Sequence, residues 1–155
     1  AADFSRRIGH ACVLSAYIKR RSNLMLIAEN APVVHAAELG HCIRESVDCL
    51  GAYGALCSFQ DDAAGKLCVK RAALAYAFFE AVVEAALPDI TSLMIHLTAQ
   101  GGGLTLRMSM EDASSRLPSH WGRDALAALG GGFSQAESDG TAFVTLCFER
   151  EGQAT

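Results

Sequence analysis

The second half of the chain switches between helical and strand periodicity in an order that few folds can satisfy. Apolar residues first recur at helical spacing and then alternate along two strand-like runs, and the pattern repeats with a shorter helix and a closing hairpin. The predicted elements are a helix at Arg71–Leu87, strands at Ser92–Thr98 and Leu104–Met110, a helix near Trp121–Leu129, and a hairpin of Phe133–Glu137 with Ala142–Glu149. This order predicts an α+β domain with the helices on one face of a mixed sheet.

The N-terminal part of the chain predicts two helices joined by a short connection. The first covers Asp3–Ala28 and ends before Pro32, and the second covers Val34–Leu50, with Gly51 and Gly54 as its stop signals. The apolar residues of the first helix near a heptad spacing are Phe4, Ile8, Ala11, Ile18 and Met25. A short connection favours an antiparallel hairpin, and apolar residues on more than one face predict a homodimer that closes a four-helix bundle.

The chain has 155 residues, of which 51% are apolar, so it can bury a substantial core. We expect residues 1–52 to form the helical hairpin, residues 53–150 the layered domain and residues 151–155 a tail. The layered domain should begin with short strands at Ala55–Phe59 and Lys66–Val69.

Charge and composition exclude several classes of function. A net charge of −4 without a basic stripe argues against nucleic acid as a partner. The longest nearly apolar run, Ala72–Ala86, contains Glu80 and Glu84 and does not predict a membrane span. The Ala1-Ala2 start is typical of a cut within a longer protein. We therefore expect a cytoplasmic location, with membrane contact only through a segment outside this sequence.

The six cysteines show neither a CxxC pair nor zinc-finger spacing. Most of them lie among apolar neighbours, as small hydrophobic residues do. The pattern predicts six reduced cysteines and no disulfide.

The whole order of elements resembles the C-terminal region of sensor histidine kinases. In that family a dimerisation and phosphotransfer hairpin is joined to an ATPase domain of the gyrase, Hsp90, histidine kinase and MutL superfamily. Arg123–Gly131 is similar to the family's last helix and its Gly-Gly exit, and Ser138–Thr141 is similar to the turn of its closing hairpin. The resemblance implies a histidine-kinase-like ATPase sandwich, a homodimer, ATP and magnesium as ligands, and a response regulator or another signalling protein as partner.

The same resemblance assigns candidate nucleotide-site residues. Glu80 and Glu84 match the family's Glu-x-x-x-Asn box, so Glu84 replaces the asparagine that binds magnesium, and its carboxylate could still do so. Asp112 matches the aspartate that reads adenine, and Thr141 lies at the pocket wall. The glycines that should follow Asp112, and the later glycine-rich box, are absent, although phosphate loops need them for close backbone approach.

The phospho-acceptor position is altered as well. Ser5 stands where the family has its reactive histidine, which leaves His10 as the candidate acceptor on the first helix.

These substitutions predict a signalling module with impaired or absent ATP binding and autophosphorylation, and hence no cofactor. Two alternatives remain open at this point. The chain could be an active, divergent ATP-dependent histidine kinase, with ATP and magnesium as ligands, or a protein-interaction domain similar to anti-sigma factors of the same superfamily.

Overall fold

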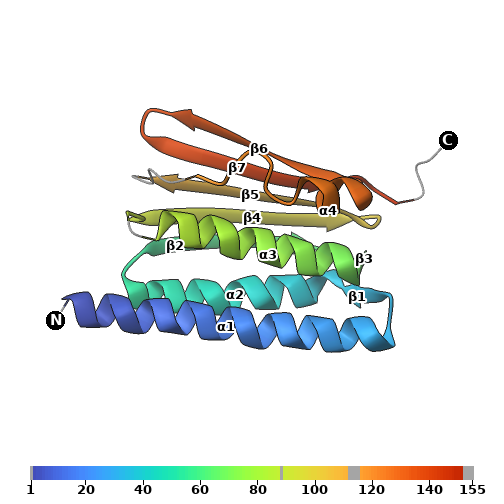
Figure 1. Ribbon diagram of the computed structural model, residues 1–155, viewed down its shortest axis with the longest axis horizontal. Helices are drawn as coiled ribbons and strands as arrows, with labels where there is room; N and C mark the ends of the chain where they lie inside the picture. Colours follow the sequence, from blue (N-terminus) through green and yellow to red (C-terminus); the bar gives the residue numbers. More distant parts are fainter. Residues whose placement is uncertain (1, 88, 112–115, 152–155) are drawn as a thin grey trace.

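The computed structural model describes residues 2–87, 89–111 and 116–151, and it has an α+β fold in which a helical hairpin precedes a five-stranded mixed sheet (Figure 1). The elements in chain order are α1 (Ala2–Asn30), β1 (Val33–His35), α2 (Ala36–Tyr53), β2 (Leu56–Ala63), β3 (Lys66–Cys68), α3 (Val69–Ala86), β4 (Ser92–Gln100), β5 (Gly103–Glu111), α4 (Arg123–Ala128), β6 (Gly131–Ser138) and β7 (Thr141–Phe148). Every helix and strand expected from the periodicity is present, with shifted ends.

The large sheet has the strand order β2-β4-β5-β7-β6, in which β2 runs parallel to β4 and the other neighbours are antiparallel. The central strands bury every second side chain, as a sheet covered on one face requires. The buried residues of these strands are Leu93, Ile95, Leu97 and Ala99 of β4, Leu104, Leu106, Met108 and Met110 of β5, and Ala142, Val144, Leu146 and Phe148 of β7. Helix α3 covers this apolar face and leaves the opposite face exposed (Figure 1).

The hairpin lies beside the sheet rather than apart from it. Figure 1 shows α1, α2 and the edge strand β2 side by side, with α1 outermost. Arg44 of α2 lies over the ring of Phe59 in β2, 4.5 Å from its centroid, and Gly40 approaches Asp61 so closely that an added Cβ would lie 2.1 Å from a carboxylate oxygen. Helix α2 therefore covers the backbone edge of β2, which would otherwise be open to pairing.

The boundaries of α2 differ from expectation at both ends. Val34 pairs with Leu67 in a small β1–β3 sheet that the sequence did not predict, so α2 begins two residues later than expected, at Ala36. At its other end α2 continues through Gly51 and stops at Gly54, whose φ of 108° is left-handed. Three residues are too few to show a strand periodicity, which is why β1 was missed.

The prediction of six reduced cysteines is wrong. A disulfide joins Cys12 of α1 to Cys49 of α2, with a Cα–Cα distance of 5.5 Å. The two residues are 37 positions apart in the chain, and only the register of the antiparallel helices brings their side chains together. Cysteine spacing alone carries no information about that register.

At the end of the molecule where α3 begins, far from the disulfide, the Arg71 side chain binds three other segments. Its guanidinium donates hydrogen bonds to the backbone carbonyls of Leu129, Gly102 and Glu149, at 3.0, 2.7 and 2.6 Å. Buried charges are tolerated when they are hydrogen-bonded in this way. No helix within the described ranges is long and apolar enough to cross a bilayer.

Candidate functional site

Helix α3 presents two different faces, because residues three or four positions apart share a side of a helix. Phe78 and Val82 face the sheet, and Phe78 packs its ring against Trp121 and Phe133, at centroid distances of 5.6 and 5.3 Å. Glu80 and Glu84 lie on the other side of the helix. The structure therefore turns the two glutamates toward the helical hairpin.

The hairpin-facing row of α3 is Tyr76, Glu80 and Glu84, one turn apart. The Tyr76 ring lies 5.3 Å from that of Tyr17 in α1, and its hydroxyl is 3.0 Å from that of Ser46 in α2. Burial raises the pKa of Tyr76, so it stays a neutral phenol. This pair of contacts anchors α3 to both helices of the hairpin.

Glu84 meets His10 of α1. The His10 Nε2 atom lies 3.2 Å from both carboxylate oxygens of Glu84, and both side chains are partly exposed. The structure thus brings together the candidate acceptor and the candidate magnesium ligand, but as partners of each other.

Glu80 lies between these two contacts. Since α1 touches α3 through Tyr17 at one turn and His10 at another, its residues 10–17 pass over Glu80. The Glu80 side chain is only 5% exposed, and neither of its oxygens has a hydrogen-bond partner among the described residues. Desolvation, and secondarily the charge of Glu84, raises its pKa to about 8. Glu80 is therefore largely an uncharged carboxylic acid at neutral pH.

The space between α3 and the sheet, which Ala142 lines next to the predicted site residue Thr141, is nearly filled. The cavity there has a volume of about 10 Å³, roughly the room that one water molecule needs. It is lined by Val82, Ala85, Met110, Arg116, Leu117, Gln135, Ala142, Phe143 and Val144. Ligand pockets of small molecules occupy roughly 300–1,000 Å³.

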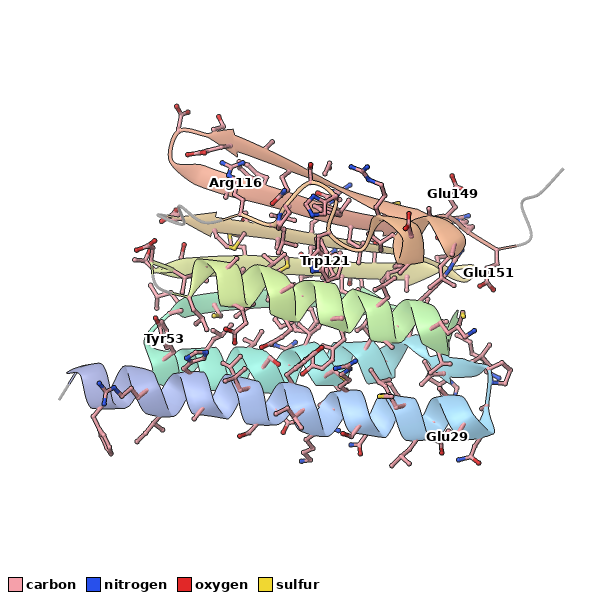
Figure 2. The ribbon with its side chains drawn as sticks, in the orientation of Figure 1. Glu29, Tyr53, Arg116, Trp121, Glu149 and Glu151 are labelled. Atoms are coloured by element: carbon pink, nitrogen blue, oxygen red, sulfur yellow. A yellow bond between two sulfur atoms is a disulfide. The ribbon has the colours of Figure 1, made fainter. Side chains whose placement is uncertain are left out.

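The segment after residue 115 closes this cavity from outside. The Gln135 side chain accepts a hydrogen bond from the Leu117 backbone N–H at 3.2 Å and donates one to its carbonyl at 2.9 Å. Arg116 forms an ion pair with Glu137, and Trp121 packs edge-on against Phe133. Figure 2 shows Arg116 and Trp121 on this segment, in front of the sheet.

The other predicted site residues do not join the glutamates. Asp112 lies outside the described residues. Thr141 begins β7 and pairs with Glu111 of β5 and Ser138 of β6. No three His, Cys, Asp or Glu side chains in the described part of the chain lie close enough to share a metal ion.

The sequence interpretation missed two features of this region. The first is the Cys12–Cys49 bond, and the second is the Tyr76–Ser46 contact at the base of the glutamate row. The spacing of Tyr76, Glu80 and Glu84 was a usable signal, since it places all three on the side of α3 opposite to its apolar face.

A helical hairpin that leads into a mixed five-stranded sheet, with α3 across its apolar face, is the fold of the histidine-kinase catalytic region. The histidine kinase domain of the blue-light-activated kinase from Erythrobacter litoralis EL346 matches 88% of this chain and 74% of its own, with a TM-score of 0.60 and 17% identity. The Acinetobacter baumannii histidine kinase AdeS matches 88% of this chain and 76% of its own, with a TM-score of 0.57 and 9% identity.

A bacterial phosphotransferase shares the fold over 90% of this chain and 92% of its own, with a TM-score of 0.54 and 8% identity. No family model matches the sequence, and no curated protein sequence matches it. The similarity thus shows the histidine-kinase fold.

Proposed function

We propose that this chain is a cytoplasmic signalling module with the histidine-kinase fold that acts as a dimer and does not bind ATP or phosphorylate itself. The observation that carries the proposal is the filled space between α3 and the sheet, with a cavity of about 10 Å³. Its partner is a response regulator or another signalling protein that docks on the module.

The contacts around the cavity make its opening costly. A nucleotide could enter only if the two Leu117–Gln135 hydrogen bonds and the Trp121 ring contacts were broken. Each hydrogen bond contributes about 0.5–1.5 kcal/mol, and each aromatic pair about 0.5–1.5 kcal/mol beyond its buried area. The chain lacks the phosphate-binding glycines that could offset this cost. We therefore expect its affinity for ATP to fall from the ordinary micromolar range to the millimolar range.

The outward face of α1 supports the dimer. Residues that follow a heptad spacing on this face are all exposed, namely Phe4, Ile8, Ala11, Ser15, Ile18, Ser22 and Met25, and we call them the α1 stripe. The four large residues of the stripe are 51–68% exposed. The outward residues of α2 include His41, Arg44 and Asp48, which are polar. We therefore assign the interface to α1 of two copies, since exposed apolar stripes of this kind mark association surfaces.

Calorimetry with ATP tests the proposal, with and without magnesium, and with an ATP-binding histidine kinase as the positive control. We expect a dissociation constant of about 1 mM or weaker. The matched variant Glu84→Asn restores the family's asparagine and should not bind ATP either, because the space between α3 and the sheet stays closed. Binding below about 100 μM, or transfer of labelled phosphate to His10, would show instead that the chain is an active kinase.

A further inference from the structure

The Cys12–Cys49 bond is placed where α1 has few other attachments. Of residues 4 and 7–11, whose burial the structure describes, Gly9 alone is buried. An added Cβ at Gly9 would lie 2.5 Å from the Tyr53 Cα, so the two helices touch there. The described polar link of this segment to α3 is the partly exposed His10–Glu84 pair. The disulfide is thus the strongest connection of the first turns of α1.

The remaining cysteines differ from this pair. Cys42, Cys57, Cys68 and Cys147 are unpaired. Burial raises the pKa of the Cys42 and Cys57 thiols to about 11, and a thiol must ionise before it can attack a disulfide. Cys12 and Cys49 are the two cysteines that the fold brings together as a pair, with their Cα atoms 5.5 Å apart, a separation typical of disulfides.

We propose that Cys12 and Cys49 form a reversible thiol–disulfide site that exchanges with low-molecular-weight disulfides of the glutathione type and controls the attachment of the first turns of α1. The half-buried Cys12 is the more accessible sulfur, and Cys49 is buried. Cys12 is the sulfur that the small molecule meets first, and Cys49 resolves the intermediate.

Formation of the Cys12–Cys49 disulfide consumes one glutathione disulfide. The Cys12 thiolate attacks glutathione disulfide, forms a mixed disulfide and releases one glutathione thiolate. The Cys49 sulfur then attacks the Cys12 sulfur of the mixed disulfide and releases the second glutathione. Two protein thiols are oxidised, and one glutathione disulfide is reduced to two glutathione thiols, which take up the two protons.

Opening of the bond has two structural consequences. The His10–Glu84 pair separates as residues 4–11 leave α2 and α3. Phe4 and Ile8 of the α1 stripe also lose their fixed position, which should weaken the dimer interface. This second consequence rests on the proposed function. The local release of α1 does not depend on dimer formation.

Equilibration of the full chain in buffers of graded glutathione to glutathione-disulfide ratio tests the proposal. Differential alkylation and mass spectrometry should find one reversible intramolecular pair, Cys12 with Cys49. On reduction, hydrogen exchange of backbone amides in residues 4–13 should rise at least tenfold, while the amides of α3 keep their protection. The variant Cys12→Ser should match the reduced protein, and Cys42→Ser, a matched control, should match the oxidised wild type.

Two results would overturn the inference. One is a Cys12–Cys49 pair that never forms, or never reopens, across the glutathione ratios. The other is equal exchange of residues 4–13 in the oxidised and reduced protein. Sedimentation in both redox states measures dimer formation independently of amide exchange. A monomer that still shows redox-dependent exchange contradicts the proposed dimer and supports the thiol–disulfide site.

Discussion

Glu80 is the residue whose charge depends most on how the elements pack. It is covered by α1, has no described hydrogen-bond partner, and its pKa is raised to about 8 by burial and by Glu84. In an unfolded chain the same carboxyl titrates near its ordinary value. Folding is therefore coupled to a proton on this single side chain.

The coupling predicts how stability varies with pH. Below the ordinary pKa of 4.5, Glu80 is protonated in both states, and between 4.5 and about 8 the unfolded chain releases the proton that the folded protein keeps. The free energy of unfolding should thus fall as pH rises through this window, by on the order of a few kcal/mol. The variant Glu80→Gln cannot ionise, so at pH 8 it should be more stable than wild type.

Thermal and urea unfolding at several pH values, compared between wild type and Glu80→Gln, measure this difference directly. Glu29→Gln is the matched control, because Glu29 lies exposed near the end of α1 (Figure 2). A wild-type-minus-variant difference that does not change between pH 5 and pH 8 would contradict the assignment.

At the scale of elements, the long periodic segments could be predicted from the sequence, and the contacts between them could not. The helices α1 and α3 and the hairpins β4–β5 and β6–β7 were all expected, because each has a sustained period or a glycine turn. The hairpin-facing row of Tyr76, Glu80 and Glu84 can also be found from its one-turn spacing in the sequence. Which element it meets depends on the position of α1 beside α3, and no local pattern encodes that position.

Two glycines on the hairpin provide a test of helix packing. An alanine Cβ at Gly9 would meet the Tyr53 backbone at 2.5 Å, whereas at Gly40 it would meet the end of the Asp61 side chain, which is exposed and can move. Alanine favours a helix over glycine by about 1 kcal/mol. We expect Gly9→Ala to destabilise the protein by about 1–3 kcal/mol despite that gain, and Gly40→Ala to change stability by less than about 1 kcal/mol.

Urea denaturation of the oxidised protein, with wild type alongside, gives both values. Equal stability of the two variants would mean that α1 and α2 are not in the close contact that Gly9 and Tyr53 indicate.

At the scale of the whole molecule, the sheet and the hairpin form one layered body, because α3 packs against both. Its inner face contacts the sheet and its outer face contacts α1 and α2. Glu80 and Glu84, which the resemblance assigns to a nucleotide site, lie here on the face of α3 that packs against the helical hairpin. The exposed large hydrophobic side chains of the described helices lie on α1, and four of them belong to the α1 stripe.

The stripe predicts a dimer that a single charge disrupts. Ile18 lies at its centre and is 63% exposed, so Ile18→Glu would place a carboxylate in the apolar interface and should yield a monomer. Asn23→Glu, an exposed position of α1 outside the stripe, should leave the dimer intact. Analytical ultracentrifugation at micromolar concentration compares the three proteins, and a wild-type monomer would refute the assigned interface.

The two ends of the molecule should differ in local stability, because Arg71 holds one of them together. Its three hydrogen bonds join the β4–β5 turn, the end of α4 and the end of β7 to one buried cation, so opening any of these segments removes a hydrogen bond from a buried charge. Backbone amides of the segments bound by Arg71 should exchange with solvent only when the protein unfolds completely. Backbone amides near Gly9 should exchange by local fraying of the start of α1, most readily in the reduced protein. The start of α1 is thus the segment of lowest local stability, and it carries His10.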